Sequence, residues 1–239
     1  MHQNIKKLYG AKLGATDGEI GHVKDFYFDD KSWAIRYLVV DTGSWLSGRE
    51  VLLSPHAFAT HPFAGAEGDI KILQVNLSRK RIEESPSIDS HRPVSRQYEE
   101  DYYRYYGWSG YWQEGGMLGV AGFPVVVPPF TPEERPHHGH NQRDDLHLRS
   151  AKAVAGYHVD ATDGRVGAVD SFMVEGKSWT IRELAVETGH WYAGKTIFLR
   201  TENVDRISYT DSTVFVKLAK QDIMETAKNH VTHAAAGHS

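Results

Sequence analysis

Two arginines recur in the middle of otherwise apolar runs and are the first candidates for binding chemistry. Arg36 lies in KSWAIRYLVVDTG and Arg182 lies in KSWTIRELAVETG. A guanidinium that is partly removed from water needs a carboxylate partner or a bound anion. We expect a structural ion pair with Asp41 or Glu187, which end the same two runs, and anion binding is the alternative.

Aromatic residues form the second group of candidates. Two tryptophans lie in glycine-bracketed loops, and residues 96–116 hold six Tyr and two Trp, with the first tyrosines at helical spacing. Tyr and Trp are enriched where proteins bind one another. The candidate interaction surface comprises Trp45, Trp191, Tyr102, Tyr105, Tyr106, Trp108, Tyr111 and Trp112.

Both aromatic groups have a structural alternative. The loop tryptophans can pack over the end of a barrel, and residues 96–116 can fold back over apolar surface. Stacking on single-stranded nucleic acid is disfavoured, because acidic residues such as Glu99 and Asp101 are interleaved with the rings. The Pro-rich stretch that follows is expected to be an extended connector.

No residue pattern indicates catalysis or a resident metal. Of the 14 histidines, seven gather in residues 137–147 and 230–238, a Pro/Gly-rich loop and a tail that offer ligands little support. There are no cysteines, which excludes thiol catalysis and thiolate metal sites. Asp17 and Asp163 lie in TDG turns, where Asp has a structural role. We therefore expect no enzyme activity, no cofactor and no native metal site.

The composition indicates a globular protein in the cytoplasm. Its 239 residues are 40% hydrophobic and 24% charged, with a formal net charge of -4, so a nucleic-acid partner is not expected. The longest apolar stretch, Met117–Phe130, is too short to cross a bilayer and is broken by prolines. A protein partner, and association with a second copy, remain the expected interactions.

The chain repeats itself. A shift of 146 positions aligns Ala15–Phe58 with Ala161–Val204 without a gap, and about 19 of the 44 pairs are identical. Two copies of roughly 80 residues indicate a duplicated small domain. Tyr37 faces Glu183 in this alignment, and we interpret such differing positions as exposed ones.

Each copy predicts several short strands followed by a helix. After the TDG turn, Ile20 and Val23 are three residues apart, whereas Phe26 and Phe28 alternate, and this change of parity within one strand predicts a β-bulge or bend. Ser78 is a predicted N-cap for a helix that stops before Pro86. We interpret Asp25 and the neighbouring Asp29 and Asp30 as a solvated acidic edge. The fold expected is mainly β, a small barrel or sandwich per copy.

The repeated pattern resembles the PRC-barrel domain, which occurs in the photosynthetic reaction-centre H subunit and in ribosome-maturation barrel proteins. The matching residues of the first copy are Gly18, Ile20, Val23, Asp25, Phe26, Phe28, Asp29, Trp33, Ile35, Arg36, Leu38, Val40, Asp41, Gly43 and Trp45. The second copy keeps the pattern with similar residues at four positions, Val166, Val174, Glu175 and Glu187, whereas Ser171 replaces Asp25. The resemblance implies two six-stranded barrels and an interaction or assembly role, and it brings no catalytic residues.

These observations predict two PRC-type barrels in tandem, at residues 1–90 and 147–239, each with a short C-terminal helix. Residues 91–146 form an aromatic- and Pro-rich connector between them. The function expected is a non-enzymatic interaction or assembly module. An RNA- or ribosome-associated assembly factor is one alternative, and a small-molecule or anion sensor that uses Arg36 or Arg182 is the other.

Overall fold

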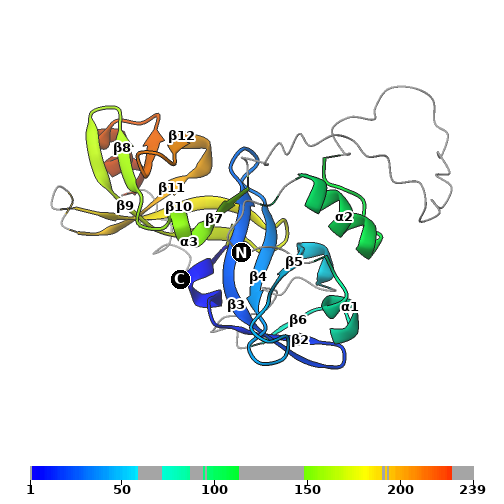
Figure 1. Cartoon of the computed structure of the whole chain (residues 1–239). Helices are drawn as coiled ribbons and strands as arrows, with labels where there is room; N and C mark the ends of the chain where they lie inside the picture. The colour runs from blue at the N-terminus through cyan, green and yellow to red at the C-terminus, as the bar shows by residue number, and fades with distance from the viewer. Residues whose placement is uncertain are drawn as a thin grey trace, which may run out of the picture. The chain divides into compact units, whose positions relative to one another are not determined.

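A computed structural model describes residues 2–58, 72–86, 94, 96–112, 148–189, 192 and 194–227. The chain divides into two compact units, one formed by Met1–Glu84 with His147–Ser239 and the other by Ser85–Leu146. Both copies of the repeat therefore fall in the first unit, and the aromatic segment falls in the second. Figure 1 shows the strands of the first unit and the separate green helix of the second.

The first half of the larger unit is a run of strands that ends in a helix. Its elements are β1 (His2–Asn4), the 3-10 helix η1 (Ile5–Leu8), β2 (Lys12–Ala15), β3 (Gly18–Asp29), β4 (Ile35–Asp41), β5 (Glu50–Leu53), the 3-10 helix η2 (Pro55–Ala57), β6 (Ile72–Gln74) and α1 (Arg79–Glu83). The predicted N-cap is confirmed, since Ser78 Oγ accepts a hydrogen bond from the Arg81 N–H at 3.3 Å.

The second half follows the same order with one additional strand, β12, which has no counterpart among the described residues of the first half. Its elements are β7 (Leu148–Ser150), α3 (Ala151–Val154), β8 (His158–Ala161), β9 (Gly164–Glu175), β10 (Thr180–Thr188), β11 (Thr196–Arg200), the 3-10 helix η4 (Thr201–Asn203), β12 (Val204–Ser208) and β13 (Thr213–Val216). Residues 220–227 are helical, so the predicted terminal helix is present in this half too.

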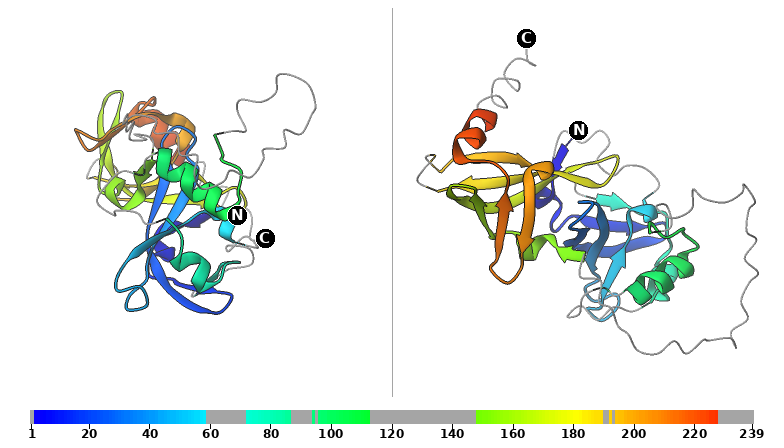
Figure 2. Two further views of the ribbon diagram at one scale, coloured as in Figure 1. Left: turned by 45° about the vertical axis from the view of Figure 1, so that its right-hand side comes forward. Right: turned by 90° about the horizontal axis from the view of Figure 1, so that it is seen from above.

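The strands form two mixed sheets, ordered β5-β4-β3-β2-β6 and β11-β10-β9-β8-β13-β12. In each sheet one pair is parallel, β2 with β6 and β8 with β13, and the other neighbours are antiparallel. Neither sheet closes among the described strands, so the expectation of closed barrels is wrong for this part of the chain. In the second half, η4 turns the chain between β11 and β12, and no ladder joins these two strands. Figure 2 shows the two sheets from two further directions.

The predicted bulge is present in the long strand of the first half. The register of β3 against β4 shifts between Val23 and Asp25 and again between Tyr27 and Phe28. Ahead of the bulge, Gly21 has φ +139°, and a Cβ there would lie 2.0 Å from the Asp41 carbonyl oxygen. Only glycine allows this close approach of two backbones, which bends β3 around the core.

Equivalent hydrogen bonds connect the TDG turn to the terminal helix in both halves. The side chain of Asp17 accepts from the Arg79 N–H at 2.7 Å, and that of Asp163 accepts from the Lys220 N–H at 2.9 Å. The TDG aspartates therefore hold the start of the terminal helix in their own half. Their role is structural, as predicted, but it is long-range rather than confined to the turn.

The two halves exchange their N-terminal strands. Strand β1 of the first half pairs with β9 of the second half, where His2 is opposite Glu175. Strand β7 of the second half pairs with β3 of the first half, where Leu148 is opposite Asp29. An isolated bridge between Ala34 and Thr180 completes the contact. The edge of each long strand is thus covered by a strand from the other half, which removes an exposed edge and joins the halves.

Three aspartates of β3 and its following turn were predicted to face solvent, and two of them bind this exchanged segment. Asp25 accepts hydrogen bonds from the Ser150 hydroxyl and from the Lys152 N–H, the latter at 3.1 Å. Asp30 accepts from the Tyr209 hydroxyl at 2.6 Å and from Arg149 Nε at 3.2 Å. The interpretation of a solvated acidic edge is therefore wrong, because these carboxylates hold the partner strand instead of repelling one.

The core of each half is apolar and consists largely of side chains from the strands of its sheet. Fully buried large side chains include Phe26, Phe28, Phe172, Leu38 and Leu53. Tyr37 is also 0% exposed, so its interpretation as an exposed position is wrong. Its counterpart Glu183 keeps only 13% of its side chain exposed, which places a carboxylate where the first half has a buried ring.

The smaller unit contains the helix α2 (Arg96–Tyr106), as the tyrosine spacing predicts. Gly107 ends it with φ +74°, a left-handed conformation that suits glycine at a helix C-terminus. The chain then turns, and the Trp108 N–H donates to the Tyr103 carbonyl at 3.0 Å.

Candidate functional site

The two candidate arginines form ion pairs, but not with the predicted partners. Arg36 Nη2 lies 3.5 Å from Asp29 Oδ2, and Arg182 Nη2 lies 2.6 Å from Glu175 Oε2. Asp29 and Glu175 end the long strands β3 and β9 and occupy equivalent positions. Asp41 instead accepts a hydrogen bond from the Gly43 N–H at 2.8 Å, so the assignment to Asp41 and Glu187 is wrong.

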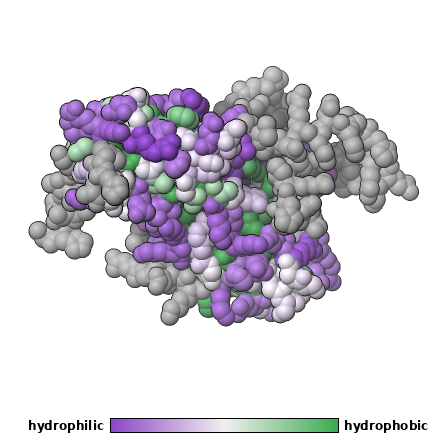
Figure 3. Space-filling view, turned by 60° about the vertical axis from the view of Figure 1, so that its left-hand side comes forward, coloured by the Kyte–Doolittle hydropathy of each residue, from purple (hydrophilic) through white to green (hydrophobic). Residues whose placement is uncertain are grey.

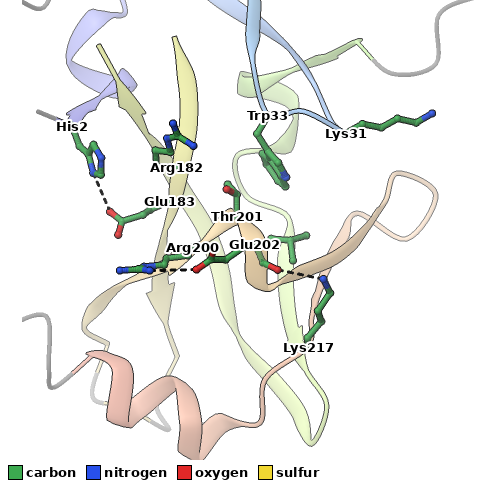
Figure 4. A pocket seen from close by; sticks show the side chains of 10 residues that line it. His2, Lys31, Trp33, Arg182, Glu183, Arg200, Thr201, Glu202 and Lys217 are labelled. Atoms are coloured by element: carbon green, nitrogen blue, oxygen red, sulfur yellow. Dashed lines mark hydrogen bonds and ion pairs between the residues drawn. The ribbon is translucent and has the colours of Figure 1, made fainter. Parts of the chain in front are cut away.

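A cavity in the larger unit lies where the two halves meet, and Arg182 is on its wall. Its volume is about 680 Å³. The first half contributes His2, Lys31 and Trp33, and the second half contributes Arg182, Glu183, Arg200, Thr201, Glu202, Val204 and Lys217. Figure 4 shows the Trp33 indole directed into this space, opposite η4. Arg36, the other candidate, does not line it.

The cavity has more cationic than anionic side chains. Four Lys or Arg face two Glu along its wall. Glu183 lies 3.7 Å from His2 Nδ1, and Arg200 Nη1 lies 3.3 Å from Glu202 Oε1, with both of the latter side chains largely exposed. The ammonium of Lys217 donates to the Glu202 carbonyl oxygen at 3.3 Å, and no carboxylate among the described residues pairs with it.

The equivalent place in the first half is filled by rings. Phe58 corresponds to Val204 in the repeat, and its ring lies 5.2 Å from the Trp179 ring. Tyr37, fully buried, corresponds to Glu183. Two aromatic side chains of the first half are thus replaced by smaller or charged ones in the second, and this replacement accounts for the open space beside Trp33.

The loop tryptophans can be compared only in part. Trp45 is half-buried, and the Arg79 guanidinium stacks over its ring at 4.6 Å. This contact ties the loop to the start of α1 and favours packing for this ring. Trp191 lies outside the described residues.

The aromatic residues of the smaller unit form one cluster. Tyr102 and Tyr106 have ring centroids 4.9 Å apart, and Trp108 stacks on Tyr106 at 4.6 Å with an interplanar angle of 12°. Tyr102 is 0% and Tyr106 is 4% exposed, so these two candidates are internal. The four candidates that keep part of their surface exposed are Tyr105, Trp108, Tyr111 and Trp112.

A buried carboxylate, that of Glu99, binds two other residues of this smaller unit. Glu99 is 0% exposed, and it accepts a hydrogen bond from the Tyr111 hydroxyl at 2.9 Å and pairs with Arg96 Nη1 at 2.9 Å. The Arg96 guanidinium also stacks over the Trp112 ring at 4.6 Å. Burial, together with the charge of Glu99, raises the pKa of the Tyr111 hydroxyl well above its usual value.

A cluster between the halves was not predicted. The Arg149 guanidinium lies 3.6 Å from the Tyr209 ring centroid, and both side chains bind Asp30. Burial, followed by the hydrogen bond to Asp30, raises the pKa of the Tyr209 hydroxyl. All three groups satisfy one another, which identifies a structural contact rather than a reactive centre. Sequence spacing carries no signal for it, because its members are far apart in the chain.

The described residues hold neither a cluster of metal ligands nor a membrane-spanning helix. Within the ranges given above, no group of three or more His, Cys, Asp or Glu is placed to hold a metal ion. The two histidine-rich segments lie outside those residues. No helix in the described ranges is both long and apolar enough to span a bilayer.

The fold and its junction define a protein built from two mixed β sheets that share exchanged strands, with a separate aromatic helical unit. Residues 4–83 match the PRC-barrel domain model, so this domain is found in the N-terminal part of the chain. The match ends within α1 and does not include the second half. No curated protein matches the chain.

Proposed function

We propose that the chain is a non-enzymatic interaction or assembly module in which a second PRC-barrel domain follows the first. The carrying observation is the N-terminal PRC-barrel domain, a type of domain that suggests interaction or assembly. The second copy is supported by the repeated sequence and by the shared strand order of the two sheets. The equivalent bonds from Asp17 and Asp163 to the terminal helices give further support.

The exchanged strands suit an assembly role. Because β1 and β7 each add to the sheet of the other half, the two copies form one platform in a single chain, with no need for a second subunit. Copies held in this way can diverge at their surfaces while the shared contact is kept. A partner would then meet two related but different faces.

Rings and charges, rather than an apolar patch, are available for binding. Ile72 is the one large hydrophobic side chain among the described residues that is strongly exposed, at 56%. The face in Figure 3 is mainly hydrophilic, with small scattered apolar areas. We propose that Trp108, Tyr111 and Trp112 of the smaller unit anchor a protein partner, since aromatic side chains supply binding energy without a broad apolar surface.

The proposal is tested by affinity capture from lysate of the source organism, followed by reconstitution with the purified partner. Three proteins are compared: the full chain, a variant without residues 96–116, and a control without residues 117–137, a deletion of equal length. We expect one protein to bind the full chain and the control stoichiometrically, and to bind the first deletion at least tenfold more weakly.

Other outcomes are equally informative. Equal recovery by all three proteins would show that the aromatic segment is structural. Recovery that is lost after ribonuclease treatment would favour the RNA- or ribosome-associated alternative. If nothing is recovered, or if the purified chain turns over a substrate, the non-enzymatic interaction module is the wrong assignment.

A further inference from the structure

The cavity at the junction of the halves has three properties that together indicate a ligand. The first is its size, since about 680 Å³ lies within the range of small-molecule sites. At the equivalent place in the first half, the Phe58 ring packs on the Trp179 ring. Val204 follows η4 as Phe58 follows η2, and in both cases the backbone N–H donates to the first residue of the 3-10 helix. The backbone is thus the same in both halves while the filling ring is absent from one.

The second property is charge that the protein does not neutralise. Arg182 is paired with Glu175, and Arg200 with Glu202. Lys31 and Lys217 have no carboxylate partner among the described residues, and Lys217 contacts only a backbone carbonyl. In the first half the position of Lys217 is taken by the neutral Asn76, whose N–H makes the same bond to η2. Figure 4 shows the Lys31 ammonium directed away from the cavity and from Lys217, so a phosphate in the cavity would meet Lys217.

The third property is a flat apolar wall. The Trp33 indole stacks on Phe28 with centroids 5.6 Å apart and an interplanar angle of 10°, which fixes its orientation. Its remaining surface faces the cavity in Figure 4. An indole held in this way offers a stacking surface to a flat ring. Glu183, largely buried, lies on the other side of the cavity with its carboxylate directed toward His2.

We propose that this cavity binds a small phosphate ester that carries a flat ring, of the size of a mononucleotide. The ring stacks on Trp33, and the phosphate lies toward Lys217. Because Arg182 and Arg200 are paired with Glu175 and Glu202, the ammonium of Lys217 supplies the charge that attracts an anion to this wall. The site goes beyond the assembly role, because it uses neither the aromatic helical unit nor any protein partner.

The decisive variant is Val204→Phe, which gives the second half the residue that the first half has at Phe58. Binding of AMP and GMP to the full chain is measured by isothermal titration calorimetry and by quenching of tryptophan fluorescence. We expect saturable binding to the wild type and at least a tenfold loss of affinity in V204F. Urea unfolding of V204F checks that the fold is kept.

A second set of variants does not depend on packing. Lys217→Asn removes an exposed charge and should weaken binding about three- to tenfold. Lys177→Ala is the control, because Lys177 is an exposed lysine of the same half that does not line the cavity. We expect K177A to bind as the wild type does.

Two partial ligands test the two parts of the proposal. Ribose 5-phosphate carries the phosphate without the ring, and adenosine carries the ring without the phosphate, so both should bind at least tenfold more weakly than AMP. The proposal is overturned if neither AMP nor GMP binds saturably up to about 10 mM. It is also overturned if V204F and K217N bind like the wild type, or if either partial ligand binds as tightly as AMP.

Discussion

Trp33 and Trp179 have the same backbone contact and opposite side-chain surroundings. The Trp179 carbonyl accepts a hydrogen bond from the Ile35 N–H at 2.8 Å, and the Trp33 carbonyl accepts from the Ile181 N–H at 2.8 Å. Both residues have left-handed backbones, with φ values of 53° for Trp179 and 59° for Trp33. Trp179 is packed by Phe58 and is 6% exposed, whereas Trp33 lines the cavity.

Replacing these two tryptophans should therefore have unequal effects on stability. We expect Trp179→Ala to lower the free energy of unfolding by about 3–4 kcal/mol, because it opens a cavity in a packed contact. Trp33→Ala should cost about 1–2 kcal/mol, since its ring already borders open space. Urea denaturation of both variants measures the difference, and equal losses would contradict the asymmetry between the halves.

The caps of the exchanged segments offer a second comparison. Ser150 Oγ accepts from the Ala153 N–H at 2.9 Å and also donates to Asp25, while Asn4 only caps η1 through the Lys6 N–H at 2.8 Å. We expect Ser150→Ala to destabilise the protein by about 1–3 kcal/mol and Asn4→Ala by about 0.5–1 kcal/mol. Thermal unfolding followed by circular dichroism tests this order, and a larger loss in N4A would reverse it.

The stability should depend on pH through Asp25. Burial raises the pKa of this carboxyl above its usual value of 3.8, although hydrogen bonds from Ser150 and from two backbone N–H groups oppose this effect. A raised pKa in the folded state means that this contribution to stability is complete below the usual pKa and is lost as the pH rises through the folded pKa. Every tenfold change in the acid dissociation constant on folding corresponds to about 1.4 kcal/mol.

Asp25→Asn removes that titration. The free energy of unfolding of D25N relative to the wild type should rise as the pH increases from about 4 toward neutrality. Asp29 on the same strand is the matched control. Burial raises its pKa, but N–H groups of Ser32 and Lys31 and the charge of Arg36 outweigh this and lower it overall. D29N should therefore lose stability relative to the wild type as the pH rises toward the usual pKa of 3.8, and the difference should stay level in the range where D25N changes.

The smaller unit should depend on Glu99. Glu99→Ala leaves the Tyr111 hydroxyl and the Arg96 guanidinium without this acceptor, whereas Glu99→Gln keeps an oxygen within reach. We expect E99A to destabilise the aromatic cluster by about 1–3 kcal/mol and E99Q by less. Near-ultraviolet circular dichroism and limited proteolysis report on the cluster. A cluster in E99A as ordered and protease-resistant as in the wild type would mean that the carboxylate does not organise it.

The repeated sequence predicted the strands and helices well, because the sequence signals for them come from neighbouring residues. The TDG turns, the parity change between Val23 and Phe28, and the cap at Ser78 each depend on neighbours in the chain. The tyrosine spacing in residues 96–106 predicted α2 for the same reason. These features fix which residues form strands and helices, but they do not say which strands pair.

The strand exchange could not be predicted from the sequence, and the reason is physical. HQN and LRS are strands of three residues, too short for a periodic pattern, and each would satisfy its backbone equally well on either half. The role of Asp25 could not be read without this pairing. Its partner Ser150 comes from the other copy, so a buried acceptor was interpreted as a solvated acidic edge.

The sequence contains a signal of the cavity, but we interpreted it as a sign of exposure. Tyr37 against Glu183 and Phe58 against Val204 are differences between aligned positions, and differing positions were interpreted as exposed. A ring exchanged for a smaller or charged side chain also fits a site that only one copy has. Exposure and loss of a packed ring give the same sequence signal, and only the contact of Phe58 with Trp179 separates them.

The central claim is that the two halves exchange their N-terminal strands and so form one platform. Because the chain has no cysteines, engineered pairs report on it without interference. His2→Cys with Glu175→Cys joins opposed residues of β1 and β9, and Leu148→Cys with Asp29→Cys joins the equivalent residues of β7 and β3. Opposed residues on adjacent strands have Cα separations that a disulfide can span.

The control pair is His2→Cys with Asp29→Cys, which would be opposed if the first half kept its own N-terminal strand. The account predicts that mild oxidation of the monomer gives an intrachain disulfide in the first two pairs and none in the control, as read by peptide mapping. A disulfide between positions 2 and 29, or one that forms only between two chains in the first two pairs, would contradict it.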